Sequence, residues 1–92
     1  MDREFRVAVT TDAQTGDLMA VYFQVRRGKA TKVREFEHGN ALANYNHKGE
    51  LLGIELLGPC HVKVVDRIAK KDATVKRFVR SSAPRRMLLA SK

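Results

Sequence analysis

The sequence predicts an α+β fold in which a five-stranded antiparallel β-meander is followed by two C-terminal α-helices. Up to about Leu57, apolar residues recur at every second position, which is typical of strands; beyond Pro59 their spacing is near 3.6, which is typical of helices. Turn-forming residues divide the first part into short segments. A chain of 92 residues holds one hydrophobic core, so we expect a single domain made of three parts: a β-meander at 1–58, a basic helical segment at 59–84 and a tail at 85–92.

Two strands are expected before Gly28. The first covers 5–10, where apolar side chains alternate with polar or small ones and create one apolar face: Phe5, Val7 and Val9. Gly16 then supplies a turn conformation that other residues resist. The second strand covers 18–25 and is apolar on both faces, which predicts a position in the interior of the sheet.

Three further strands are expected between Gly28 and Pro59, at 30–36, 41–45 and 51–57. A tight turn at Gly28 joins the first of them to the preceding strand, and we expect Val33 to point inward while Lys32 and Arg34 face water. Gly49 supplies the left-handed residue of the hairpin between the last two strands. One face of the final strand carries its core residues: Leu52, Ile54 and Leu56.

Two amphipathic helices are expected after Pro59, a residue that the first turn of a helix tolerates. The first begins near His61; the second covers about 73–82, with Asp72 as its N-cap and Pro84 as its stop. The inward-facing residues follow the helical spacing: Val64, Val65, Ile68 and Ala69, then Val75, Phe78 and Val79. In the tail, the apolar residues Met87, Leu88 and Leu89 either pack against the body or belong to a frayed basic end.

The net charge of +8 lies wholly in the last third of the chain. Residues 1–60 carry eight basic and eight acidic side chains, whereas residues 61–92 carry ten basic and two acidic ones. The outward faces of the two helices hold most of this excess: Lys63, Arg67, Lys70, Lys71, Lys76, Arg77 and Arg80. Because a cationic face attracts phosphates and acidic side chains, we expect these residues to bind an anionic partner, either nucleic acid or an acidic protein. The alternative is an ordinary solvated face.

A second candidate surface lies on the other face of the predicted sheet. Small residues make it shallow: Ala8, Ala20, Ala43 and Gly53. Tyr22 and Tyr45 are its aromatic groups, and we expect them to form an interface in a homodimer, because small residues permit close approach and tyrosines anchor interfaces. The alternative is a platform on which single-stranded bases stack. The unpaired edges of an open sheet also invite pairing.

No catalytic or metal-binding constellation stands out in the sequence. His38, His47 and His61 lie in predicted turns and at a helix start, without the spacing of a zinc site. Cys60 follows a proline, has no neighbouring base, and is best interpreted as a packed thiol. We therefore expect no enzymatic activity, no metal and no cofactor.

The sequence also bears on the compartment of the protein. The single cysteine cannot form an intrachain disulfide, and no apolar run approaches the length of a membrane span. The N-terminal residues lack the long apolar region of a signal peptide. We expect a cytoplasmic protein that does not contact membranes.

The stretch from Asp17 to Leu57 resembles a small bacterial family known as domain of unknown function 2283. The likeness lies in three segments: Gly-Asp-Leu-Met-Ala-Val-Tyr-Phe at 16–23, Gly-Lys-Ala-Thr at 28–31, and Gly-Glu-Leu-Leu-Gly-Ile-Glu-Leu-Leu at 49–57. Ala20 stands where the family usually has tyrosine, and 44–48 is less acidic than is typical. The resemblance covers about half of the chain and leaves the basic helices outside. It supports the predicted β part, implies no established activity, and implies an antitoxin-like role.

The predicted function is therefore that of a small binding or regulatory protein without enzymatic activity. Its basic C-terminal helical face would bind the anionic partner. The alternative is a structural module for homo-oligomerisation or protein interaction that binds no nucleic acid.

Overall fold

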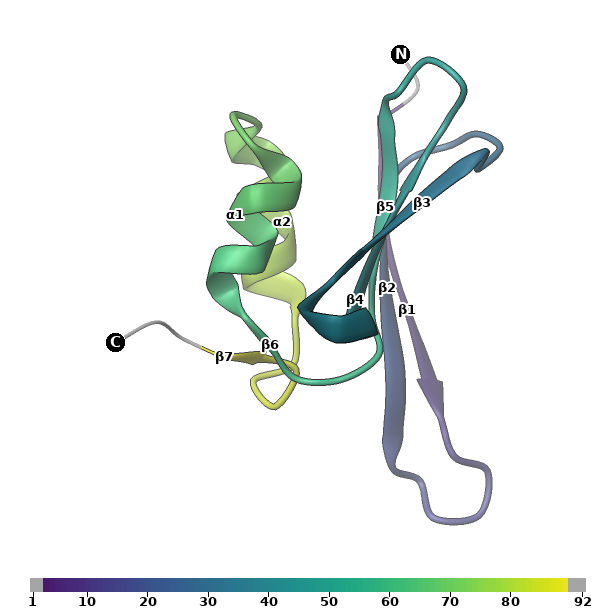
Figure 1. The fold of residues 1–92 in the computed structure, drawn as a ribbon. Coiled ribbons are helices and arrows are strands. Elements are labelled where there is room, and N and C mark those ends of the chain that lie inside the picture. The colour runs from purple at the N-terminus through teal and green to yellow at the C-terminus, as the bar shows by residue number, and fades with distance from the viewer. Residues whose placement is uncertain (1–2, 90–92) are drawn as a thin grey trace.

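The computed structural model describes residues 3–89 and confirms the fold class, because a five-stranded antiparallel sheet is followed by two helices (Figure 1). The elements are β1 (Arg3–Thr11), β2 (Leu18–Arg26), β3 (Lys32–Phe36), the short 3-10 helix η1 (Glu37–Gly39), β4 (Ala41–Tyr45), β5 (Leu51–Leu56), β6 (Cys60–His61), α1 (Val62–Ala69), α2 (Ala73–Ser82) and β7 (Leu88–Leu89). No helix among the described residues is long and apolar enough to cross a membrane.

The strand order is β1-β2-β5-β4-β3, which is not the order of a simple meander. β2 pairs with β5, and the loop at 27–31 carries the chain to the far edge of the sheet instead of forming a hairpin with β3. Composition explains this arrangement. β5 is mostly apolar and suits the buried centre, whereas β3 carries Lys32, Arg34 and Glu35 and suits an edge whose backbone meets water.

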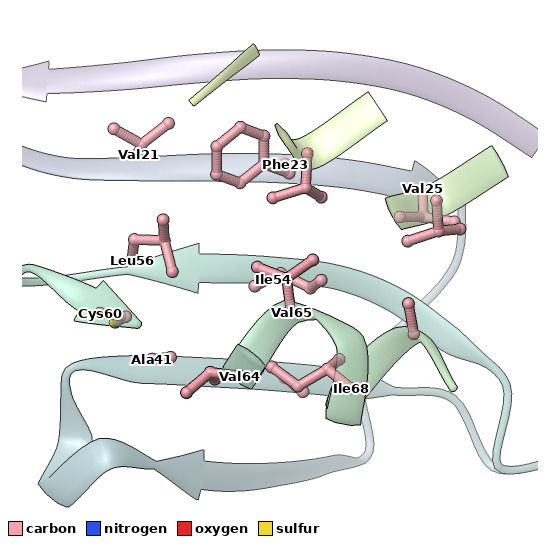
Figure 2. Packing of buried hydrophobic residues seen from close by; sticks show 14 of the residues in the cluster. Val21, Phe23, Val25, Ala41, Ile54, Leu56, Cys60, Val64, Val65 and Ile68 are labelled. Atoms are coloured by element: carbon pink, nitrogen blue, oxygen red, sulfur yellow. The ribbon is translucent and has the colours of Figure 1, made fainter. Parts of the chain in front are cut away.

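Both helices lie on one face of the sheet, and the other face is left bare (Figure 1). The register places Val21 opposite Leu56 and Phe23 opposite Ile54, so these four side chains share the covered face. Figure 2 shows them on the two central strands, with Ile54 beside Val65 of α1, and together they form the centre of the hydrophobic core. Residues from both helices complete this cluster: Val64, Val65, Ile68, Ala69, Val75 and Val79.

Local signals at the helix ends are confirmed. The Asp72 carboxylate accepts a hydrogen bond from the backbone N–H of Val75 at 3.1 Å and caps α2. α2 ends at Ser82, two residues before Pro84. His61 caps α1, since its Nδ1 accepts from the backbone N–H of Lys63 at 3.3 Å.

The orientation predicted for β3 is wrong. Arg34 pairs with Ala43 and Phe36 with Ala41, and both alanines are fully buried beneath the helices. Since directly opposite residues share a face, Lys32, Arg34 and Phe36 all lie on the helix side. Val33 instead lies on the bare face and is 54% exposed. The single valine between charged residues, Val33, did not indicate which face of β3 is buried. The buried face is instead the one that carries the aromatic side chain of Phe36.

A register shift in the β4–β5 pair changes the expected faces of β5. Asn44 is opposite Gly53, but Tyr45 is opposite Leu51, so Leu52 is an extra residue in the ladder. As a result Leu51, and not Leu52, packs against the core cluster. Leu52 is buried outside that cluster, next to Gly28.

The tail packs against the body through Met87 and Leu88, while the side chain of Leu89 is 49% exposed. Met87 is buried, and its carbonyl accepts a hydrogen bond from the backbone N–H of Cys60 at 3.0 Å. β7 then pairs in parallel with β6. Of the two alternatives for this segment, packing is confirmed for Met87 and Leu88, while residues 90–92 of the tail lie outside the described part of the chain.

We predict that Ile54→Ala lowers the free energy of unfolding by about 2 to 5 kcal/mol, because it removes a fully buried side chain at the centre of the sheet. Val33→Ala is the matched control, an exposed β-branched residue on an edge strand, and should change stability by less than about 0.5 kcal/mol. Urea titration of both variants measures the difference. Equal effects would contradict the core described above.

Candidate functional site

The seven predicted cations do not form one continuous stripe. Six are exposed and Lys76 is half-buried. α1 packs against the β3 edge of the sheet, because Arg67 lies over the ring of Phe36. α2 packs against β1, because the ring centroids of Phe78 and Phe5 are 4.8 Å apart. The structure therefore divides them into two groups: Lys63, Arg67, Lys70 and Lys71 on and after α1, and Lys76, Arg77 and Arg80 on α2.

The α2 group is partly neutralised. The guanidinium of Arg80 donates two hydrogen bonds to the Asp66 carboxylate, at 2.9 and 2.8 Å, and so ties α2 to α1. Both side chains are well exposed, so this pair adds about 0 to 1 kcal/mol to stability. Lys76, Arg77 and Arg80 line only a wide, shallow depression together with Ala73 and Ser81. This face offers cations without a shaped recess.

The α1 group continues onto the sheet. Arg67 of α1 and Arg34 of β3 both lie over the ring of Phe36, at 5.6 and 5.5 Å from its centroid. Each contact of this kind contributes about 0.5 to 1 kcal/mol at an exposed site. A guanidinium group that lies over an aromatic ring still has N–H donors with which it can bind an anion. Phe36 therefore joins cations of the helix to cations of the sheet.

A basic hollow lies where these elements meet. Its lining consists of Lys32 and Arg34 from β3, Tyr45 from β4, Gly49 from the following turn, and Lys70 just after α1. Three cations and one aromatic residue thus line the recess, and no acidic side chain among residues 3–89 belongs to this lining. At the other end of α1, by contrast, Lys63 and Arg67 share a depression with Glu37. The basic hollow is the most strongly cationic recess along α1.

Sequence reasoning missed Lys32 and Arg34, because the first 60 residues are neutral in sum. A signal was present nonetheless. Lys32 and Arg34 alternate in step with Phe36, so an inward Phe36 requires all three to share its face. Only the pairing of β3 with β4 shows that this face is the one beside α1.

Lys70 occupies an uncommon backbone conformation, with φ 56° and ψ −114°. Its backbone N–H donates to the carbonyl of Asp66 at 2.8 Å and closes the last turn of α1. Glycine adopts such a conformation at little cost, whereas a lysine there is strained by an amount on the order of 1 to 3 kcal/mol. A strained residue that lines a basic hollow is a candidate for a functional role.

Tyr22 and Tyr45 lie on opposite faces of the sheet, which corrects the predicted shared surface. Ala43 pairs with Ile54 and is buried beneath the helices, and Tyr45 packs against the same core. Tyr22 alone remains on the bare face, where its ring covers Gly53 so closely that an added Cβ would meet the hydroxyl at 2.1 Å. Partial burial raises the pKa of Tyr22, and a hydrogen bond with Asn44 opposes that shift. Register decides this outcome, because each pair on the ladder shares one face.

The remaining candidate side chains have structural surroundings. His61 caps α1, while His38 and His47 are exposed in turns. Among residues 3–89, no group of three or more His, Cys, Asp or Glu side chains is placed to hold a metal ion. Cys60 is 1% exposed, its thiol donates to the Gly58 carbonyl at 3.2 Å, and burial raises its pKa to about 11. A thiol with that pKa is almost wholly protonated at neutral pH and is a poor nucleophile.

Comparison of the chain with protein-family models, with curated proteins and with solved structures gives no match. The assignment of a site consequently depends on the geometry alone, and the geometry favours the basic hollow.

We predict that Cys60 makes stability fall at alkaline pH. In the unfolded chain the thiol ionises near its ordinary pKa of 9.0, whereas in the folded protein it stays protonated until about pH 11. Its contribution is therefore complete below pH 9 and is lost as the pH rises toward 11. Cys60→Ala lacks this contribution but shares all other titrations. The difference in unfolding free energy between wild type and variant, measured by urea titration across this range, should shrink with rising pH; a constant difference would contradict the prediction.

Proposed function

We propose that this protein is a small non-enzymatic nucleic-acid-binding protein and that the basic hollow is the centre of its binding surface. One observation carries the proposal: Lys32, Arg34 and Lys70 come from two distant parts of the chain and line one recess together with Tyr45. Lys63 and Arg67 extend the surface along α1. Lys71, Lys76, Arg77 and Arg80 then serve as outlying cations that raise the local concentration of a polyanion.

The aromatic ring favours nucleic acid over an acidic protein. Cations alone suit either partner, but a half-buried tyrosine among them offers a face on which a base can stack, with a gain of about 1 to 3 kcal/mol. Unpaired bases are accessible for stacking only in single strands, loops and ends. Single-stranded nucleic acid is therefore the partner we propose. The antitoxin-like role stays a prediction of the family resemblance and would require a protein partner in addition.

We predict that neutralising the hollow weakens binding of a single-stranded oligonucleotide more than tenfold. The variant is Lys32→Gln/Arg34→Gln/Lys70→Gln, and the control is Arg6→Gln/Arg85→Gln/Arg86→Gln, which removes the same charge from exposed positions away from the hollow. The plot of log K against log salt has a negative slope, and its magnitude should be smaller by about 2 in the variant, since each of the three lost phosphate contacts on a single strand contributes about 0.7. Fluorescence anisotropy over a salt series measures both quantities.

Lys70→Gly separates binding from stability in the same assay. Glycine relieves the strain at φ 56°, so this single variant should melt no lower than wild type while it loses affinity. Equal weakening by the hollow variant and the control would show that only total charge matters. Failure of the wild type to bind any oligonucleotide, together with nuclease-resistant capture of one acidic protein, would overturn the proposal.

A second candidate function, self-association without nucleic acid, is supported by the outer edge of β1. Figure 1 shows the β1–β2 hairpin extending past the helices. Four apolar side chains of the hairpin remain exposed: Phe5 at 38%, Val7 at 43%, Val9 at 53% and Met19 at 53%. β1 has nine residues, and no strand within residues 3–89 pairs with its outer side. A second copy paired antiparallel about Val7 would set Phe5 of each chain opposite Val9 of the other and cover this strip.

We predict that Val7→Lys/Val9→Lys weakens any homodimer more than tenfold, since each buried valine contributes about 1.5 kcal/mol or more. Val33→Lys is the control, because Val33 is equally exposed but lies on the opposite edge strand. Sedimentation over a concentration series measures the dissociation constants. A wild type that stays monomeric throughout, or a dimer that both variants leave intact, would contradict pairing at β1.

A further inference from the structure

A second cavity adjoins the basic hollow. Its volume is about 270 Å³, and it lies between the helices and the end of the sheet where β2 stops and the β4–β5 turn begins. Tyr45, Gly49 and Lys70 line both recesses, so the two adjoin at these residues. A ligand held in the hollow therefore lies next to the cavity.

The floor of the cavity is apolar. Val25, Ile68 and Val75 form it, and all three are almost completely buried. Figure 2 shows Val25 and Ile68 at the same end of the core. Small-molecule pockets usually have volumes of about 300 to 1,000 Å³, so this cavity, just below that range, suits a small ligand group. A single flat ring system meets this requirement.

The mouth of the cavity is polar. Arg3 forms an ion pair with Asp72 on one side, and Arg26 lies 3.8 Å from Glu50 on the other. All four side chains are partly exposed, which places them toward solvent and not on the floor. The guanidinium of Arg3 lowers the pKa of Asp72, and a hydrogen bond from Asn46 lowers that of Glu50, so both carboxylates accept hydrogen bonds at neutral pH. Both donors and acceptors are thus present beside an apolar floor.

Nucleobases combine a flat apolar face with donors and acceptors along the edge, and a sugar joins them to phosphate. We infer that the cavity receives one nucleobase while Lys32, Arg34 and Lys70 hold the phosphate attached to it, which makes this a site for a single nucleotide. This inference rests on the proposed function and adds a specificity to it. A protein with a cavity for one base would prefer nucleic acids with a free end or an extruded base, whereas the rest of the surface recognises only the backbone. The nucleotide can come from a strand or be free in solution.

The test uses the intact chain and oligonucleotides that carry fluorescent 2-aminopurine at the 5′ end, at the 3′ end or in the interior. We expect a change of fluorescence on binding at one end and a smaller change elsewhere. Ala69→Leu fills the cavity from α1, and Leu51→Phe fills it from β5 should the first variant fail to fold. Either variant should lose the fluorescence change and bind the strand about fivefold more weakly, while its salt slope stays that of wild type.

Two further arms separate the outcomes. Adenosine monophosphate tests binding of a free nucleotide. If it competes with the end-labelled strand, the site accepts both a nucleotide within a strand and a free nucleotide. If inorganic phosphate competes to the same degree, no base is bound. Inorganic polyphosphate tests the cationic surface without bases. Salt-dependent binding of every strand with no position-dependent fluorescence, or with fluorescence unchanged in the filled variants, would overturn the cavity while leaving the proposed function intact. Binding of polyphosphate but of no oligonucleotide would overturn both.

Discussion

The pairing of β2 with β5 is the constraint on which the rest of the structure depends. It sets Phe23 opposite Ile54 and Val21 opposite Leu56, and these side chains form the base on which both helices pack. Because β5 also pairs with β4, the most apolar strands occupy the centre and the charged β3 is left at an edge. Helices that cover the centre of a sheet leave its margins open to solvent. The exposed apolar side chains of β1 (Phe5, Val7 and Val9) and the basic hollow beside β3 are both consequences of this arrangement.

In the helical layer, the residues that stabilise the fold are different from those of the proposed binding surface. Val65, Val75 and Val79 are buried against the sheet, and Asp66 and Arg80 bind each other across the two helices. These groups hold the layer together and leave little for a ligand. The turn between α1 and α2 differs from this packed region. Its backbone is strained at Lys70, and the cavity beside Lys70 is not filled by side chains. The described lining of the basic hollow has cations but no acidic residue to neutralise them. A fold that uses strain and empty volume in one place concentrates its capacity for binding there.

The sequence by itself determined the local features of this protein. The alternation of apolar residues defined the five main strands to within a few residues, and the N-cap Asp72, the stop before Pro84 and the left-handed Gly49 (φ 82°) follow from the chemistry of those residues alone. The buried face of each helix was likewise predictable, since helical spacing depends only on neighbours along the chain. The division between a neutral β part and a basic helical part could also be counted directly.

Only the tertiary structure decided which strand lies beside β2, which face of β3 meets the helices, and which cations gather. Val33 and Phe36 are apolar on opposite faces of one short strand, so alternation alone could not choose between them; burial of Ala41 and Ala43 against the helices did. The register similarly placed the two tyrosines on different faces, because Tyr45 alternates in step with the buried Ala43, whereas Tyr22 is opposite Glu55. Which face of a strand is buried depends on contacts between residues far apart in the chain. The free energy of burying one face has to be compared with that of burying the other, and the local sequence pattern does not contain this information.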